Sequence, residues 1–434
     1  MFVIFVIILA HEFGHYITAV WTGVRVKEFS LGFGTRLWGR KSGGTEYNLR
    51  AIPIGGFVEL AGTDPKLAEE ESDIPEQEKF INKNVLQRFL ILFAGSFFNF
   101  LLALLIFAII FIFIGIPQPK YTKEPTIGSL LPGKPAEAAK FKTGDLITGI
   151  DGITVETWDS MADIITRKPG MPLTISYLRQ GILERTVVTP ELNKTGEGII
   201  GIVRGVIPVV GEMVPGKPAA LAGILEGDRI LSINGETICN WERAVEIINH
   251  NVDKELSINI ERKSGTLTVK CKPEFSQELE AGIIGIGFVQ EFVKGTNPLS
   301  ALRYAWENTV QNTFFMMKGI AKLVSGKIAL KNVTGPIGIA GVVKHRADRG
   351  IGALLSVIAL LSLNIGLINL FPFPALDGGR ILFLLIEVLM RRKVSIKVEE
   401  MIHLVGLYAL LLLLVLVSYR DFKNLEFIRK LNLF

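Results

Sequence analysis

Long apolar runs and mixed polar sequence alternate along this chain of 434 residues. A helix needs about 20 residues to cross the roughly 30 Å hydrocarbon core of a bilayer, and several of the runs approach or exceed that length. We therefore expect a multi-span α-helical membrane protein with about four transmembrane helices. They are predicted over residues 1–21, 89–117, 351–390 and 401–419.

Three polar segments separate these runs. Residues 22–60 alternate apolar and polar positions and contain many glycines, which favours short β-strands. Residues 61–88 are rich in charge and are predicted to form a cytoplasmic loop. The long middle, from about 122 to 290, has the mixed composition of a water-facing insert.

The insert contains an internal duplication. Pro132-Gly-Lys-Pro-Ala136 recurs 83 residues later as Pro215-Gly-Lys-Pro-Ala219. A unit of this length is too long for a solenoid repeat, so we expect two copies of a small domain. Asp-Gly and Asn-Gly pairs between β-branched runs predict hairpin turns, and each copy also has a helical segment. The copies are predicted over residues 122–205 and 206–290.

A helix of another kind is predicted after the insert, over residues 297–327. Asn297-Pro298 is typical of a helix start, and apolar residues then recur at helical spacing. Such a helix lies on the membrane surface or packs in the protein core, and the pattern leaves both open. The apolar residues are Leu299, Leu302, Trp306, Val310, Phe314, Met317, Ile320 and Val324.

Charge indicates the orientation of the chain. The net charge of +5 is small and scattered, which argues against a nucleic-acid partner. Basic residues gather after the first run and between the last two, so both loops should be cytoplasmic and the insert extracytoplasmic. The basic C-terminal tail argues mildly against this. The first ten residues have neither a basic region nor a cleavage site, so we expect no signal peptide.

The only two cysteines, Cys239 and Cys271, both lie in the second copy. An extracytoplasmic location permits a disulfide, but free thiols fit the sequence equally well.

His11-Glu12-Phe13-Gly14-His15 lies within the first apolar run. Residues four apart share one face of a helix, so both imidazoles can reach one Zn²⁺, and Glu12 is placed to take a proton from the attacking water. Ionisable groups are costly inside a bilayer and mark function there. The motif therefore predicts hydrolysis of peptide bonds within the membrane, with Zn²⁺ as cofactor.

A third protein ligand is expected, because catalytic zinc sites normally have three. Asp377 is the strongest candidate. Pro372, Pro374 and the glycines after Asp377 interrupt the helix there. Broken backbone at membrane depth occurs only where it is buried in protein or lines a wet cavity. We therefore expect the Asp377 carboxylate to face the metal.

Other candidate ligands have less support. Glu387 lies further into the following helix, and His403 is an isolated residue at the start of the last run. His250 and His345 lie in polar sequence and are expected to be structural or exposed.

Together these features resemble the site-2 protease family of intramembrane zinc metalloproteases, in particular its RseP-like branch with tandem PDZ domains. The resemblance rests on H-E-F-G-H in the first span, on N-x-x-P-x-P-x-x-D-G-G from Asn369 to Gly379, and on the two copies between them. It covers nearly the whole chain.

The resemblance also assigns roles to residues. It implies that His11, His15 and Asp377 hold Zn²⁺ and that Glu12 activates the water. Asn369 matches a position that contacts the substrate or supports the reacting carbonyl.

Further implications concern the substrate and its surroundings. Residues 22–60 match a membrane re-entrant β-sheet, in which a strand edge with Gly55 and Gly56 would hold an extended substrate. The implied substrates are single-span membrane proteins, such as anti-sigma factors, and remnant signal peptides. The implied location is the bacterial inner membrane, with the active site toward the cytoplasm and the PDZ-like domains outside it. There these domains contact outer segments of substrates or act as a spacer or filter, and both options stay open.

Two rival classes of protein make different demands on the sequence. A membrane scaffold would use the PDZ pair to bind exposed C-termini, with a structural zinc site closed by a fourth ligand. A zinc transporter would need a series of acids or histidines through the membrane. The sequence offers no convincing candidate for either, so the protease is favoured.

Overall fold

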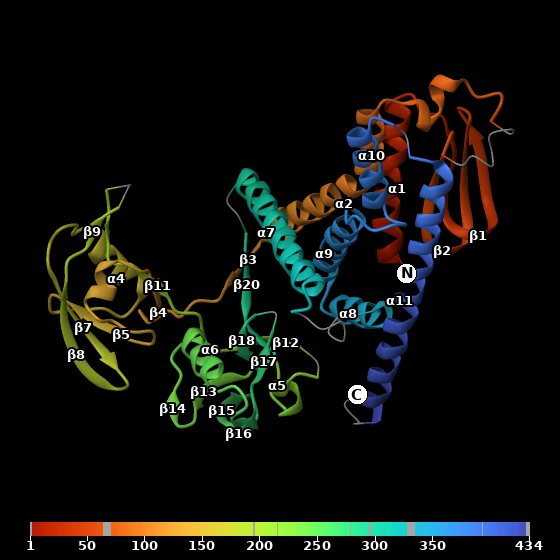
Figure 1. Cartoon of the computed structure of the whole chain (residues 1–434). Helices are drawn as coiled ribbons and strands as arrows, with labels where there is room; N and C mark the ends of the chain where they lie inside the picture. The colour runs from red at the N-terminus through yellow and green to blue at the C-terminus, as the bar shows by residue number, and fades with distance from the viewer. Residues whose placement is uncertain are drawn as a thin grey trace. The chain divides into compact units, whose positions relative to one another are not determined.

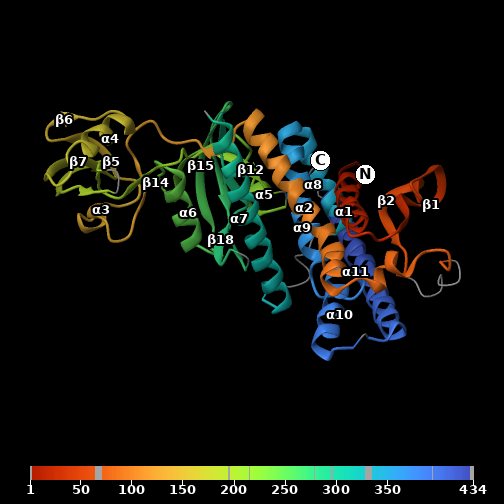
Figure 2. The same ribbon diagram turned by 90° about the horizontal axis from the view of Figure 1, so that it is seen from above.

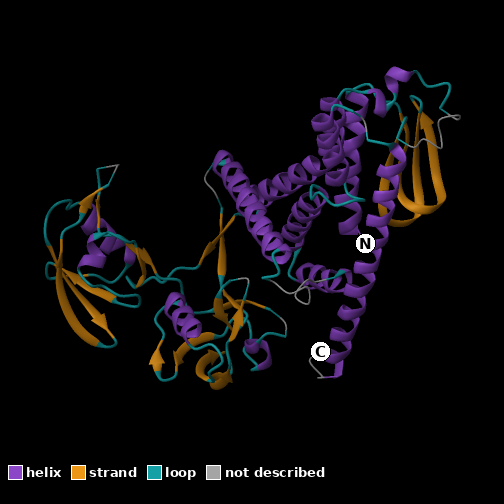
Figure 3. Cartoon of the chain, viewed as in Figure 1, coloured by secondary structure: helices purple, strands orange, loops and turns teal. Residues whose placement is uncertain are grey.

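The computed structural model divides the chain into two compact units. The first joins Met1–Ile116 to Lys294–Phe434 and is mainly helical, whereas the second, Pro117–Val293, is rich in strands (Figure 3). The structure describes residues 2–63, 71–193, 196–214, 216–277, 279–294, 297–327, 335–392 and 394–430.

Four helices of the first unit are long and apolar enough to cross a membrane: α1, α2, α9 and the Lys397–Lys423 part of α11 (Figure 1). Three further helices, α7, α8 and α10, are shorter or more polar. Their bounds are α1 (Phe2–Trp21), α2 (Val85–Phe113), α7 (Pro298–Val324), α8 (Pro336–Asp348), α9 (Ile351–Asn369), α10 (Asp377–Met390) and α11 (Ile396–Lys430).

The central helix α2 packs against both α1 and α9 (Figures 1 and 2). Their shared core includes the buried side chains of Ile7, Phe107 and Leu363. Small residues let the helices approach closely, since a Cβ on Gly14 of α1 would lie only 2.4 Å from the Ala94 carbonyl oxygen of α2. This close contact presses the motif-bearing part of α1 against α2.

A buried ion pair joins α2 to α10. The Arg88 guanidinium donates to both carboxylate oxygens of Glu387, at 2.9 and 2.7 Å, and the Arg88 side chain is only 8% exposed. Removing one partner of such a pair leaves an uncompensated buried charge. Glu387 therefore serves to attach α10 to the bundle.

A tight turn separates α9 from α10 at the predicted helix break. α9 ends at Asn369 and α10 begins at Asp377. The turn folds back onto the first residues of α10, where side chains have no room. A Cβ on Gly378 would lie 2.3 Å from the Phe371 carbonyl oxygen, and one on Gly379 would lie 2.4 Å from that of Phe373. The Gly-Gly pair thus permits the turn that carries Asp377.

The amphipathic helix α7 contacts α2 and α9 through small residues. Ala301, Ala305 and Thr309 are buried, whereas Leu299 is 70% and Trp306 60% exposed. Core packing through the large apolar residues was one of the two alternatives left open by the sequence. In the structure, small residues form the core contact instead. Of the eight predicted apolar residues, six are exposed, and the other two are half-buried.

Two long, bent strands, β1 (Val26–Ser42) and β2 (Thr45–Leu60), fold back on each other as a small antiparallel sheet. The first part of β1 lies between two parts of β2: Phe29 pairs with Tyr47 on one side and with Val58 on the other. The segment Gly56–Leu60 is thus an outer strand of this sheet. Its other edge has no strand partner among the described residues.

The strand-rich unit shows the same order of elements twice. In each half, a four-stranded antiparallel sheet, β6-β5-β7-β8 or β14-β13-β15-β16, packs with two helices around its own apolar core. The first and last strands of each half also pair, β4 with β11 and β12 with β19. The first half has β4 (Ile127–Leu130), α3 (Pro135–Ala138), β5 (Leu146–Ile150), β6 (Ile153–Thr154), α4 (Trp158–Thr166), β7 (Leu173–Arg179), β8 (Ile182–Val188), β9 (Glu191–Leu192), β10 (Gly198–Ile199) and β11 (Ile202–Arg204). The second has β12 (Val210–Met213), α5 (Pro218–Leu221), β13 (Arg229–Ile233), β14 (Glu236–Thr237), α6 (Trp241–His250), β15 (Leu256–Arg262), β16 (Gly265–Cys271), β17 (Glu274–Ser276), β18 (Ala281–Ile283) and β19 (Ile286–Phe288).

The same buried ion pair recurs in both halves. Arg179 binds Asp145 in the first half and Arg262 binds Asp228 in the second, each at 2.7 Å. Strands β3 (Ile116–Pro119) and β20 (Gln290–Val293), at the two ends of the insert, are hydrogen-bonded to each other. The duplication seen in the sequence is thus a duplication of local structure as well.

The cysteines of the second half are both free thiols, Cys239 exposed and Cys271 buried. Of the two options that the sequence left open, the structure therefore has no disulfide.

Candidate metal centre

The two histidines of α1 point their Nε2 atoms toward each other, 3.2 Å apart. The opposite ring nitrogens face α2: Nδ1 of His15 lies 2.8 Å from the Ile91 carbonyl oxygen, and Nδ1 of His11 lies 3.3 Å from the Asn99 side-chain amide. A carbonyl beside Nδ1 favours the tautomer with the proton on Nδ1, which leaves Nε2 free to bind a cation. Helix α2 thereby orients the rings.

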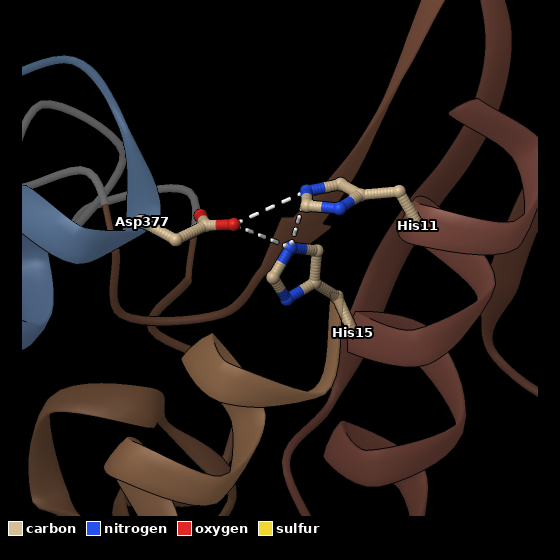
Figure 4. Close-up of side chains that lie close together, drawn as sticks. All are labelled: His11, His15 and Asp377. Atoms are coloured by element: carbon tan, nitrogen blue, oxygen red, sulfur yellow. Dashed lines mark hydrogen bonds and ion pairs between the residues drawn. The ribbon is translucent and has the colours of Figure 1, made fainter. Parts of the chain in front are cut away.

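Asp377 completes this group from the far end of the chain. Its Oδ2 lies 3.1 Å from Nε2 of His11 and 3.3 Å from Nε2 of His15 (Figure 4). The three potential ligand atoms all lie within 4.8 Å of one another. Oδ2 is buried without a hydrogen bond of normal geometry. Two imidazole nitrogens and one carboxylate oxygen are the donors of a catalytic zinc site, so these residues fit that ion.

Asn99 of α2 is a neighbour of the site that was not among the predicted site residues. The side chain is fully buried and its Oδ1 has no hydrogen-bond partner. Turning this amide by 180° about its Cβ–Cγ bond would place Oδ1 against a protonated Nδ1 of His11. Metal-binding histidines commonly donate their second ring N–H to an oxygen in this way.

Gly95 lies directly beneath the two imidazoles. A Cβ at this position would lie 2.3 Å from Nε2 of His15 and 2.7 Å from Cε1 of His11. The absence of a side chain on α2 therefore makes room for the rings. No local sequence signal marks this glycine, because the contact crosses from one helix to another.

Glu12 faces the outer strand of the small sheet. A Cβ on Gly56 would lie 3.3 Å from Cγ of Glu12. A hydrogen bond of 2.6 Å between the hydroxyls of Tyr16 and Tyr47 holds this sheet against α1. Gly55 has a different setting, with φ of +105° and its Cα packed against the Phe33 ring. Of the two predicted glycines, only Gly56 lies beside the acid.

The other candidate residues separate into near and distant ones. The Asn369 side-chain nitrogen lies 3.3 Å from Nε2 of His11, so this residue faces the site. His403 accepts a hydrogen bond from the Ala375 N–H, and Nδ1 of His250 lies near the Glu246 carbonyl oxygen, so neither joins the cluster. The side chain of His345 lies outside what the structure describes.

Comparisons with known proteins identify the family of the chain. Residues 1–414 match the model of peptidase family M50. The chain is 34% identical to Protease RseP of Yersinia pestis and 33% identical to the regulator of sigma-E protease RseP of Escherichia coli K12, covering 97% of this chain and 96% of each relative. A relative from Neisseria meningitidis, 29% identical over 98% of both chains, has zinc metalloprotease in its name.

Among solved structures, the PDZ domain of an SdrC-like protein from Listeria monocytogenes is 27% identical. The match covers 19% of this chain and 88% of that domain, with a TM-score of 0.18.

Four helices suited to a membrane and a largely buried His-His-Asp cluster fit a metalloprotease that works within the membrane. The chain belongs to peptidase family M50, and it is a zinc-dependent intramembrane protease of the site-2 type.

Proposed function

We propose that His11, His15 and Asp377 hold the zinc ion and that Glu12 is the general base for cleavage within the transmembrane segments of single-span proteins. The observation that carries this proposal is the convergence of two Nε2 atoms and one carboxylate oxygen beside Glu12, on helices suited to a membrane. A structural zinc site would need a fourth protein ligand. Among the described residues, the cluster has three members, which favours the enzyme over a scaffold.

Each side chain then has a task in peptide hydrolysis. Zinc, when bound, polarises the scissile carbonyl and makes water acidic enough to attack near neutral pH. Glu12 takes the proton from the attacking water and passes it to the nitrogen of the leaving amine. The Asn369 amide, beside His11, donates a hydrogen bond to the carbonyl oxygen as negative charge develops on it.

The outer strand Gly56–Leu60 is proposed to hold the substrate. A transmembrane helix hides its amides in intrahelical hydrogen bonds, so it must unwind before water can reach them, and free amides are costly in a membrane. A free strand edge beside Glu12 supplies new partners for those amides. In this proposal the β1–β2 sheet dips into the membrane from the cytoplasmic side, next to the active site.

The protein is proposed to lie in the inner membrane of a bacterial cell. Its duplicated insert would form two PDZ-like domains outside the cytoplasm. There they would meet the outer segments of substrates or exclude bulky ones. The exposed apolar residues of α7 suit a position at the outer membrane surface. Anti-sigma factors and remnant signal peptides are the proposed substrates, and two relatives are named as regulators of sigma-E protease.

The test uses the full-length protein purified in detergent and a single-span peptide, with and without a chelator. We expect Glu12→Gln to keep zinc but lose at least 100-fold in cleavage rate, because the base is gone while the ligands remain. Asp377→Ala should lose zinc. Glu255→Gln, an exposed acid of the insert, is the matched control and should behave like the wild type. Full zinc content in Asp377→Ala would remove that residue from the ligand set.

A further inference from the structure

The turn that carries Asp377 has an unusual conformation at Ala375. This residue has φ of +78°, a left-handed conformation that non-glycine residues seldom adopt. Such strain persists only where the surroundings enforce it. Ala375 is two residues before Asp377, so whatever holds Ala375 also sets the direction of the Asp377 side chain.

The backbone donors of this turn identify what holds it. Pro372 and Pro374 have no N–H group, and Phe373 and Leu376 donate to carbonyl oxygens within the turn. The N–H of Ala375 donates instead to Nδ1 of His403, at 2.9 Å. Ala375 is half-buried, and a backbone donor shielded from water loses free energy when it has no partner, so this side-chain acceptor stabilises the turn.

Helix α11 is closely fitted at this point. Gly406, one turn after His403, lies against Pro374, where a Cβ would come within 2.4 Å of the proline Cβ. The His403 ring also contacts the Phe383 ring of α10, with 5.5 Å between centroids. The imidazole is therefore held between the turn and α10, and its side chain is only 16% exposed.

We propose that His403 is a positioning residue of the metal centre: by accepting the Ala375 N–H, it holds the turn that aims Asp377 at His11 and His15. This inference rests on the proposed role of Asp377 as a zinc ligand. Helix α11 would thus help to position a ligand, although it supplies no ligand itself. Loss of a group that orients a metal ligand typically weakens metal binding by about 10–100-fold.

Two substitutions separate the hydrogen bond from packing. His403→Phe keeps a ring of similar size but removes the acceptor, whereas His403→Asn is smaller but places an amide oxygen near the former Nδ1. We expect the phenylalanine variant to bind zinc about 10–100-fold more weakly and the asparagine variant to stay within a few-fold of the wild type. The measurement is zinc competition with a chelator in full-length protein, with cleavage of a single-span peptide as a second readout.

A third variant tests the link through Ala375. Glycine adopts φ of +78° without strain, so Ala375→Gly should restore part of the zinc affinity lost in His403→Phe. His250→Phe, at an exposed helix end of the insert, is the matched histidine control and should leave zinc binding unchanged. If His403→Phe does not accumulate, His403→Ala with and without Ala375→Gly takes its place.

The outcomes separate this inference from the proposed function. If the phenylalanine variant holds zinc like the wild type, or the asparagine variant is the weaker of the two, His403 acts by packing alone and the inference fails. If Asp377→Ala itself keeps full zinc affinity, the proposed ligand set fails. Loss of zinc in both Asp377→Ala and His403→Phe, with retention in His403→Asn, supports both.

Discussion

At the scale of single residues, the metal centre depends on residues that no local sequence pattern marks. The spacing of His11 and His15 is a local signal, because four residues make about one helical turn. Gly95 and Asn99 carry no such signal, since they reach the histidines from another helix. The residues proposed to bind the metal could be predicted from the sequence, whereas those that shape the space around them could not.

Gly95 offers the sharpest test at this scale. We expect Gly95→Ala to weaken zinc binding by about 10–100-fold, because its Cβ would overlap both imidazoles and force them to turn away. Gly319→Ala, at a helical glycine with open space around it, is the matched control. Zinc competition with a chelator gives the answer, and equal affinities for the two variants would contradict the packing described here.

At the scale of elements, the apolar pattern predicted where the helices lie along the chain better than which of their faces are buried. The proline and glycine positions predicted a helix break before Asp377, and the structure has α9 and α10 there. The large apolar residues of α7, by contrast, do not mark its buried side. That side consists of Ala301, Ala305 and Thr309, because helices approach closely only where side chains are small. Patterning alone does not say whether an apolar stripe meets protein or lipid.

The outer strand of the small sheet gives a second prediction. A Cβ on Gly56 would lie 2.8 Å from the Ser30 carbonyl oxygen, a backbone atom that cannot move aside on its own. We expect Gly56→Ala to shift this strand relative to Glu12 and to lower kcat/KM by about 10–100-fold, since small misplacements near a reacting group have effects of that order. Zinc content should stay at the wild-type level, and Gly341→Ala serves as control. Loss of zinc together with activity would show that the strand acts on the ligands instead.

The repeated ion pair of the insert predicts a pH dependence. Burial opposes ionisation of Asp228, but hydrogen bonds from Arg262 and the Leu225 N–H, together with the guanidinium charge, hold its pKa below the ordinary value of 3.8. A lowered pKa contributes stability above the ordinary value, and that stability is lost as the pH falls through the lower one.

Asp228→Asn should therefore open the second half more readily than the wild type at pH 7, and the two proteins should converge as the pH falls below about 3.8. Hydrogen exchange of residues 223–230 in the full-length protein, corrected for intrinsic rates, measures this. Asp145→Asn changes the equivalent pair of the first half and should leave residues 223–230 unaffected. A difference between Asp228→Asn and the wild type that persists at low pH would exclude the ion pair as its source.

At the scale of the whole molecule, the two free cysteines report on which side of the membrane the insert lies. Although Cys239 is exposed, partial desolvation by neighbouring groups and the charge of Glu236 raise the pKa of its thiol, and burial raises the pKa of Cys271 to about 11. At pH 8.5, a membrane-impermeant maleimide added to intact spheroplasts should label the exposed Cys239 and spare the buried Cys271.

The matched control places the thiol on the side of the membrane proposed to be cytoplasmic. With Cys239 replaced by serine, Ser42→Cys at the exposed end of β1 should react only after the membrane is permeabilised. The reverse pattern, with Cys239 protected until permeabilisation, would overturn the proposed orientation.

The distance along the chain between the parts of the metal centre has a consequence for biosynthesis. Asp377 follows His15 by 362 residues, with the whole insert between them. At about 5–20 residues per second, the ribosome needs about 20–70 s to cover that interval. A nascent chain therefore holds two of the three proposed ligands well before the third is made. The protease stays inactive while it is being inserted, and neighbouring nascent membrane proteins are spared until its own synthesis is nearly complete.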